Sequence, residues 1–287
     1  MALATVLTLA GSDPSGGAGI QADSKTIHAL GGYALGVATA LTAQNAQGVQ
    51  AVFAVEPLIF AAQVNALLAD YHIDALKIGM LADADKVLQS ADILTKLPLK
   101  TACVLDPVLV SSSGKILLAQ DAIQHLLHHL IPKVTLLTPN LPEAQLLLEH
   151  CGVHVDLNHL LTKQQFSTIR DALAHLHCAN ILLKGGHSTE DMAVDYLFSD
   201  FHKHPQIHSF AQPRITSQHN HGTGCTLSSA IACKLAQGET LHEAVSQAKD
   251  YLQQALLHSS AGQPHYLPLK TKSHRNGGLH HFLTPLT

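Results

Sequence analysis

The stretch HGTGCTLS, residues 221–228, places two glycines and a cysteine where a helix is expected to begin. After Cys225, apolar residues recur at helical spacing as far as Gly238, which predicts a helix that stops there. Gly222 and Gly224 would let the backbone approach a ligand closely, and the free amides of a helix N-terminus favour an anion. The stretch therefore predicts a helix that begins beside a bound anion.

The thiol of Cys225 has two interpretations. In the field of a helix N-terminus its pKa would fall below about 8.5, so that it could act as a nucleophile or as a base. Alternatively, the stretch is a glycine-rich turn followed by a buried cysteine. Cys233, farther along the same expected helix, fits a buried position better. The residues alone leave the role of Cys225 open.

Outward from this stretch, short apolar runs alternate with longer helical patterns, which indicates an α/β fold with a mostly parallel sheet and helices on both faces. The expected strands are 5–9, 36–39, 75–78, 102–105, 135–137 and 181–183. The expected helices, besides the one after Cys225, are 22–30, 57–71, 120–130, 143–150 and 163–177. We expect one domain over residues 1–262 and a C-terminal extension, 263–287, of unknown role.

The composition agrees with a fold whose strands are covered on both faces. Of 287 residues, 46% are hydrophobic and 13% charged, and the formal net charge of −4 gives no reason to expect a nucleic-acid partner. The five cysteines contain no C-x-x-C pair, and no Lys or Arg precedes the N-terminal apolar run, so we expect a cytoplasmic protein. Between Lys25 and Glu56 there is no charged residue, but glycines and Gln44 interrupt this segment. A buried strand is therefore expected there instead of a membrane span.

Several expected strands end in polar residues, where an open parallel sheet binds its ligands. Asp106 ends one strand, and Glu143 follows the next; both carboxylates are reasonable Mg²⁺ partners, acting through water. Asn140 and Glu143 also match a capping box, and both interpretations can hold. Lys184, at another strand end, would suit a phosphate, although a solvated lysine is the default. The sequence predicts one cleft along this edge.

Other motifs are weaker. Residues 17–22 match the loose G-x-G-x-x-A dinucleotide fingerprint, but no acidic residue occurs from Ser24 until Glu56, so a substrate loop stays open as the alternative. The pair at 114–115 lacks the first glycine and the Ser or Thr of a Walker A loop. The H-E-x-x-H pattern at His242 is incomplete, and the histidine clusters in helical segments lack a second ligand group at metal spacing. We expect surface histidines there.

Seven segments together resemble the hydroxymethylpyrimidine/phosphomethylpyrimidine kinases of thiamine synthesis, within the ribokinase-like superfamily. They are, in the family's order, AGSDPSGGAGIQAD, TALTAQNAQGV, KIGML, LDPV, TPNLPEA, LLKGGH and HGTGCTLSSAIA. The resemblance implies a three-layer α/β/α sandwich with a mostly parallel central sheet. It also implies transfer of the γ-phosphate of ATP, with Mg²⁺, to 4-amino-5-hydroxymethyl-2-methylpyrimidine and then to its monophosphate.

The resemblance implies a role for each matching residue. Gly222 and Gly224 would belong to an anion hole, and Cys225 would take the place of the Asp base of sugar kinases, close to the substrate hydroxymethyl group. The remaining positions are Gly11, Asp23, Gln44, Met80 and Val108 for the pyrimidine, Lys184 and Asp195 for ATP, and Asp106 and Glu143 for Mg²⁺.

Two features depart from the family pattern. The family usually reads Asn-Thr before His-Gly-Thr-Gly-Cys, whereas this chain has His219 and Asn220, which alters the approach to the anion hole. The tail after Gly262 lacks the family's Gly-Pro-Leu/Val-Asn-His ending, and its basic residues and glycines predict an exposed or flexible extension.

Three alternatives stay open. A pyridoxal kinase would use the same scaffold, but Gln44 favours an aminopyrimidine, since a site built to hydrogen-bond an amine discriminates against its absence. A catalytically silent protein that senses the pyrimidine or ATP is disfavoured by the intact set of Cys225, Lys184, Asp106 and Glu143. A hydrolase with a nucleophilic cysteine lacks an assignable histidine partner. We expect a homodimer that binds small molecules, and neither nucleic acid nor membranes.

Overall fold

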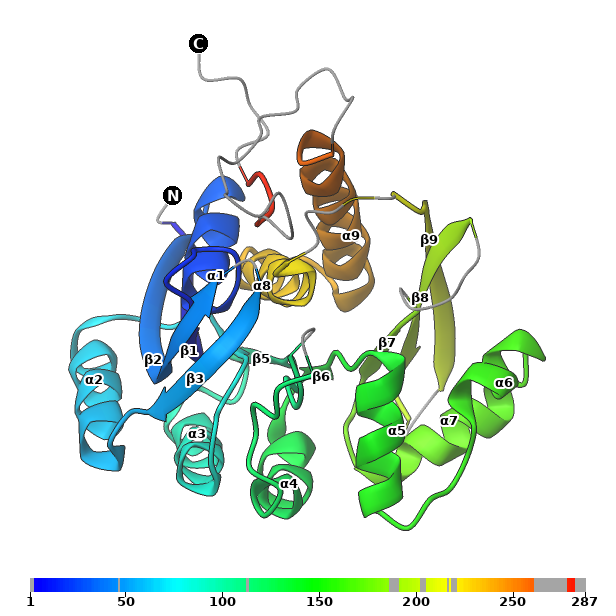
Figure 1. The fold of residues 1–287 in the computed structure, drawn as a ribbon, viewed down its shortest axis with the longest axis horizontal. Helices are drawn as coiled ribbons and strands as arrows, with labels where there is room; N and C mark the ends of the chain where they lie inside the picture. Colours follow the sequence, from blue (N-terminus) through cyan, green and yellow to red (C-terminus); the bar gives the residue numbers. More distant parts are fainter. Residues whose placement is uncertain are drawn as a thin grey trace.

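A central sheet with helices on both sides forms the body of the molecule in the computed structural model of the chain (Figure 1). The structure describes residues 3–45, 47–111, 114–185, 191–201, 205–215, 217, 221–260 and 278–281. His219 and Asn220, which depart from the family pattern, and most of the expected extension lie outside the described residues.

The strands are β1 (Thr5–Ser12), β2 (Tyr33–Asn45), β3 (Gly48–Ala54), β4 (Ala75–Ile78), β5 (Ala102–Leu105), β6 (Leu136–Leu137), β7 (Ile181–Lys184), β8 (Met192–Ser199) and β9 (Gln206–Pro213). They form one sheet in the order β3-β2-β1-β4-β5-β6-β7-β8-β9. The strands from β2 to β7 in this order are parallel, whereas β3, β8 and β9 run antiparallel to their neighbours. The expectation of a mostly parallel sheet is confirmed.

The helices are α1 (Gly19–Ala29), α2 (Pro57–Asp70), α3 (Ala84–Lys96), α4 (Ala122–His125), α5 (Leu141–His150), α6 (Leu157–Thr162), α7 (Phe166–Leu173), α8 (Thr223–Ala236) and α9 (Leu241–His258). A π-helical turn, η1 (Leu126–Leu130), and a 3-10 turn, η2 (Ile131–Lys133), continue α4, and a second 3-10 turn, η3 (Ala174–Leu176), follows α7. In Figure 1, α1, α8 and α9 lie on one side of the sheet and α2, α3 and α4 on the other. The three-layer α/β/α architecture is confirmed.

Two hydrophobic cores lie on opposite faces of the sheet, and the central strands contribute alternate side chains to each. Successive side chains of a strand point to opposite faces. In β1, Leu7 packs in the core beside α2 to α5, while Val6 packs in the core beside α8 and α9. In β5, Leu105 packs in the first of these cores and Val104 in the second. Burial on both faces explains why these strands read as continuous apolar runs.

The uncharged segment between Lys25 and Glu56 forms the end of α1 and the β2–β3 hairpin. A strand is present there as expected, but β2 is only partly buried and β3 has no buried residue. Among the described residues, no helix is both long and apolar enough to cross a membrane. Asn140 and Glu143 form the expected capping box at the start of α5: each side chain accepts a hydrogen bond from the other residue's backbone N–H. The helix expected over 163–177 begins later, at Phe166.

The expectation of an exposed or flexible C-terminal extension is wrong for residues 278–281. Gly278 pairs with His221 in a short parallel bridge, and Leu279 is buried against the body of the molecule. His281 is 2% exposed, and its carbonyl oxygen accepts a hydrogen bond from the hydroxyl of Tyr251 in α9. These residues therefore pack against α1 and α9, in the body of the molecule.

Candidate active site

The loop after β1 is held in shape by the carboxylate of Asp13. This carboxylate accepts hydrogen bonds from the backbone N–H groups of Ser15, Gly17 and Ala18 and from the hydroxyl of Ser15. The carbonyl of Gly17 then lies against Gly222, so closely that a Cβ on Gly222 would overlap it. The glycine-rich loop therefore packs directly on the residue that precedes α8.

The start of α8 lies beside two of the predicted strand-end residues. Gly222 caps the helix with a left-handed backbone, φ 85°. A Cβ on Gly224 would lie 3.3 Å from a carboxylate oxygen of Asp106 and 3.4 Å from Nζ of Lys184. A side chain there would press on both charged groups, so glycine lets the backbone lie close to them. The first-turn amides of α8, an ammonium group and a carboxylate thus meet at the carboxyl edge of the sheet, as the sequence predicted.

Lys184 and two carboxylates form a buried charge cluster at this edge. Nζ of Lys184 lies 2.8 Å from Asp106 Oδ1 and 4.0 Å from Glu143 Oε2. Burial raises the pKa of Glu143 to about 7, against the opposing charge of Lys184. The pKa of Lys184 is raised, because the two carboxylates outweigh its burial. The lysine is therefore charged, and it is not the solvated lysine of the default interpretation.

The thiol of Cys225 does not have the lowered pKa that the sequence suggested. Burial raises its pKa to about 11, although the nearby ammonium of Lys77 acts in the opposite direction. At neutral pH the group is therefore a thiol and not a thiolate. Cys233 is completely buried, as expected. At Cys225 burial, together with the charges of Asp23 and Asp106, therefore outweighs the charge of Lys77.

Asp23 does not fit the role of a pyrimidine ligand. Its side chain is 0% exposed, and its carboxylate accepts hydrogen bonds from the hydroxyl groups of Thr8 and Ser229 and from the ammonium of Lys77. These partners come from β1, α8 and β4. The carboxylate joins three elements beneath the site and presents no open surface to a substrate.

Asp195 does not fit the nucleotide pocket for a similar reason. It is 5% exposed, accepts a hydrogen bond from the backbone N–H of Gly185 at 2.9 Å, and forms an ion pair with Lys249 of α9. Asp195 lies opposite Lys184 in the β7–β8 register. Asp195 therefore holds β7, the strand that carries Lys184, and its ion pair with Lys249 ties this part of the sheet to α9. Lys249 was not identified from the sequence.

The predicted apolar residues of the pyrimidine site do come together. A Cβ on Gly11 would lie 2.9 Å from the sulfur of Met80, so the methionine side chain covers the backbone at the end of β1. Met80 packs with Ala40 and Leu117 in a small apolar cluster, and Val108 packs against it. This cluster can cover one face of a flat ring.

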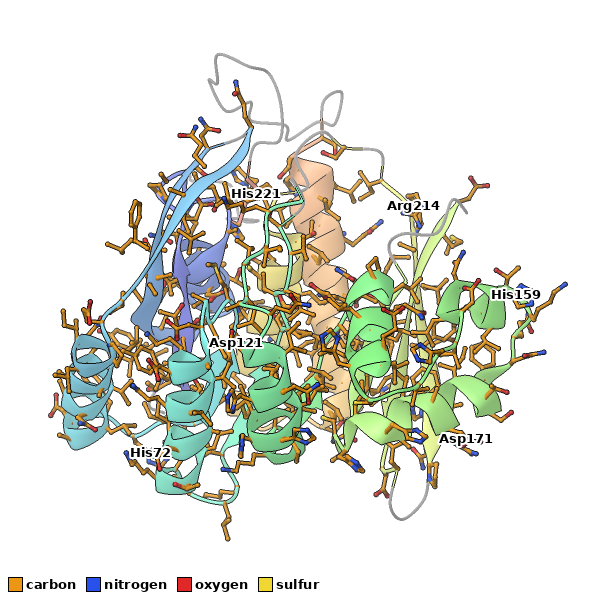
Figure 2. All side chains as sticks on the ribbon, turned by 60° about the horizontal axis from the view of Figure 1, so that its bottom comes forward. His72, Asp121, His159, Asp171, Arg214 and His221 are labelled. Atoms are coloured by element: carbon orange, nitrogen blue, oxygen red, sulfur yellow. The ribbon has the colours of Figure 1, made fainter. Side chains whose placement is uncertain are left out.

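Gln44, at the end of β2, faces the residue that leads into α8. Its amide nitrogen, as placed, lies 2.9 Å from Nε2 of His221, and the same Nε2 lies 2.9 Å from Asp13 Oδ2. In Figure 2, His221 lies between the β2–β3 hairpin and α9, whereas His72 and His159 lie at the periphery. Asp13 and His221 both lie within motifs of the sequence, but neither was expected to have a role.

The histidine clusters are on the surface, as expected. In the clusters of the helical segments, His128, His129, His175 and His177 are exposed, and His125 is half-buried. Among the described residues there is no group of three or more histidine, cysteine or acidic side chains that could hold a metal ion.

Comparison with known proteins gives a consistent result. A family model described as phosphomethylpyrimidine kinase matches residues 13–270. The hydroxymethylpyrimidine/phosphomethylpyrimidine kinase of Escherichia coli K12 is 41% identical over 276 residues, which cover 96% of each chain. The phosphomethylpyrimidine kinase structure from Clostridium difficile 630 has a TM-score of 0.71 and 36% identity, covering 88% of this chain and 99% of that one. A pyridoxal kinase from Staphylococcus aureus, in complex with AMP-PCP and pyridoxal, has a TM-score of 0.80 and 26% identity, covering 99% and 95%.

Proposed function

Because the chain belongs to the phosphomethylpyrimidine kinase family, we propose that it phosphorylates 4-amino-5-hydroxymethyl-2-methylpyrimidine with ATP and then phosphorylates the monophosphate. The product of the second step would be the pyrimidine diphosphate, for use in thiamine diphosphate synthesis, as the name of a thiamine biosynthesis relative supports. The observation that carries this proposal is the meeting of the α8 N-terminus with Lys184 and Asp106, beside the apolar cluster of Met80.

The start of α8 and Lys184 would stabilise the phosphoryl group during transfer. In phosphoryl transfer, charge spreads over the oxygens of the moving group, and the protein contributes mainly by positioning and by electrostatic stabilisation. Free amides at a helix N-terminus and a charged lysine can both position the phosphoryl group and stabilise its negative charge. Gly222 leaves room for the Gly17 carbonyl, and Gly224 keeps the backbone close to Asp106 and Lys184.

Cys225 would orient the hydroxyl group of the substrate. Its pKa of about 11 means that at neutral pH it is a thiol, with little thiolate present to accept a proton. The loose transition state of phosphoryl transfer depends little on early removal of the hydroxyl proton. A thiol beside the hydroxyl can therefore contribute by holding it in line with the phosphorus atom.

Asp106 and Glu143 fit Mg²⁺. Mg²⁺ is usually held by one or two carboxylates together with substrate phosphates. The raised pKa of Glu143, about 7, reflects a buried carboxylate near another one, a repulsion that a divalent cation would relieve. When bound with ATP, the ion would neutralise phosphate charge. ATP itself would be held by Lys184.

The homodimer stays a prediction, and the β2–β3 hairpin supports it. Leu41 and Phe53 lie opposite each other in this hairpin and are 55% and 63% exposed. Large apolar side chains at one exposed site are typical of an interface between protein chains. Sedimentation equilibrium measures the mass in solution.

We also propose that the protein works in the cytoplasm and binds neither nucleic acid nor membranes.

Release of ADP by the purified protein tests the proposed function. The protein is given ATP and Mg²⁺ with hydroxymethylpyrimidine, its monophosphate or pyridoxal in separate reactions, and a fourth reaction contains EDTA. We expect turnover of both pyrimidines, slow turnover of pyridoxal and loss of activity with EDTA. Use of pyridoxal alone would make the protein a pyridoxal kinase, and binding of pyrimidine without ADP release would make it a sensor.

A further inference from the structure

The side-chain amide of Gln44 lies between two polar groups whose hydrogens can be assigned. As placed, its nitrogen lies 2.9 Å from Nε2 of His221 and its oxygen 3.3 Å from the hydroxyl of Thr42. The two ends of an amide have nearly the same shape, so the hydrogen bonds of its neighbours decide which end faces which partner.

The first neighbour, His221, must donate from Nε2. The same nitrogen lies 2.9 Å from Asp13 Oδ2. The Asp13 carboxylate already accepts hydrogen bonds from Ser15, Gly17 and Ala18, and such bonds favour the ionised form, which only accepts. Although burial raises the pKa of Asp13, the hydrogen bonds from His221 and Ser15 hold it below its ordinary value. A hydrogen therefore lies on Nε2 of His221.

The second neighbour, Thr42, must accept at its oxygen. A threonine hydroxyl has one hydrogen. Thr42 donates this hydrogen to the carbonyl oxygen of Ser12, with an oxygen–oxygen distance of 2.9 Å. No hydrogen is then left for the amide of Gln44, so the amide must donate to Thr42.

We propose that Asp13 with His221, and Ser12 with Thr42, fix the Gln44 amide with its oxygen toward His221 and its nitrogen toward Thr42. In this orientation the N–H of His221 is shared between Asp13 and the amide oxygen, and one amide hydrogen goes to Thr42. The opposite orientation would bring two N–H groups together at His221. His221 and Thr42 are positioning residues that act through Gln44.

This inference rests on the proposed function and determines its specificity. After these bonds are made, the amide keeps one acceptor lone pair and one N–H, side by side. This edge is complementary to an amino group adjacent to a ring nitrogen, as in an aminopyrimidine, with the amino group on the side of His221. A pyridoxal ring has no amino group for this edge, and a site built for that bond discriminates against its absence.

The substitution Thr42→Val, combined with a change in the substrate, tests the inference. Valine keeps the shape of threonine but cannot accept from the amide, so Gln44 loses its fixed orientation. We expect the KM for hydroxymethylpyrimidine to rise about tenfold with little change in kcat, because one hydrogen bond is typically worth up to a factor of this size. For the analogue that lacks the 4-amino group, we expect less than a twofold change.

Two controls complete the experiment. Thr42→Ser keeps the hydroxyl and is expected to restore the wild-type KM. Thr95→Val removes a hydroxyl that donates to the Asp92 carbonyl in α3, away from Gln44. It is expected to leave the KM values for both substrates unchanged.

Two outcomes overturn the inference. One is an equal rise in KM for both substrates in Thr42→Val, which would assign Thr42 a purely structural role. The other is an unchanged KM for the aminopyrimidine. Failure of the proposed function is distinguishable, because the wild-type protein would then turn over neither pyrimidine. In that case the same pair of ligands is compared by calorimetric binding, and equal effects of Thr42→Val on both overturn the inference.

Discussion

Cys225 and Cys233 lie on one helix, two turns apart; Cys225 is partly exposed, whereas Cys233 is buried. The environment of Cys225 includes the charged groups of Lys77, Asp23 and Asp106, whereas Cys233 lies in the apolar core between α8 and α1. Their different surroundings allow one thiol to serve as the control for the other.

Cys225→Ala is expected to lower kcat about 100-fold with the fold retained, because loss of the group that orients the hydroxyl misplaces the reacting atoms. Cys233→Ala is expected to lower the free energy of unfolding by about 1–2 kcal/mol and to leave kcat unchanged, since it only opens space in the core. Steady-state kinetics and urea unfolding of both variants measure this. Wild-type kcat in Cys225→Ala would contradict the proposed role.

At the scale of single residues, the sequence could predict which residues approach the site, but not how deeply they are buried or what their pKa is. Asp23 and Cys225 were both found from motifs. Asp23 is nevertheless sealed by Lys77, which lies 54 residues away along the chain, and the same lysine and the depth of burial set the pKa of Cys225. Burial and charge partners of this kind come from tertiary contacts, which residue spacing does not contain.

Helix α8 has a left-handed glycine at each end, and the two ends differ in what surrounds them. Gly222 has φ 85° and touches the Gly17 carbonyl, whereas Gly238 has φ 92° and a Cβ there would meet nothing within 4 Å. The backbone strain of an alanine is therefore similar at both ends, and only the first end adds a steric conflict.

Gly222→Ala is expected to lower kcat/KM about 100-fold, because the new methyl group pushes the loop of Gly17 away from the anion hole. Gly238→Ala is expected to cost about 1 kcal/mol of unfolding free energy without a change in kcat/KM, since it only strains a left-handed residue. Kinetics and urea unfolding separate the two effects. Equal kinetic losses in both variants would show that strain alone is responsible.

At the level of elements, buried strands were the easiest to predict. The bounds of β4 and β5 agree with the sequence because an apolar run covered on both faces ends where the burial ends. β8 and β9 were missed, since half-exposed antiparallel strands carry a weaker apolar signal. α3 was missed although Asp83 caps it by accepting from the Lys86 backbone N–H, a signal that the sequence does contain.

On the scale of the whole molecule, the end of the chain returns to the site. Residues 278–281 reach Gly17 and His221 at one end and lie between α1 and α9 at the other. An extension was expected there because two buried residues, Leu279 and His281, in a polar tail give no periodic signal. Their burial depends on helices more than twenty residues away, which only the complete fold brings together.

This docking predicts a dependence of stability on pH. Burial lowers the pKa of His281 to about 4, from an ordinary value near 6.5. The folded protein therefore keeps His281 neutral at a pH where the unfolded chain already binds a proton there. Its contribution to stability is complete above pH 6.5 and is lost as the pH falls through 4.

His281→Gln is expected to remove this contribution, because glutamine cannot be protonated. As the pH falls from 7 to 4, the unfolding free energy of the wild-type protein should fall more steeply than that of the variant, by at most about 3 kcal/mol. His159→Gln, at an exposed histidine, should instead keep the wild-type slope. Urea unfolding at pH 7, 5.5 and 4.5 measures the slopes. Parallel slopes for His281→Gln and the wild-type protein would show that His281 accepts a proton in the folded state, and that residues 278–281 do not hold it in a dry environment.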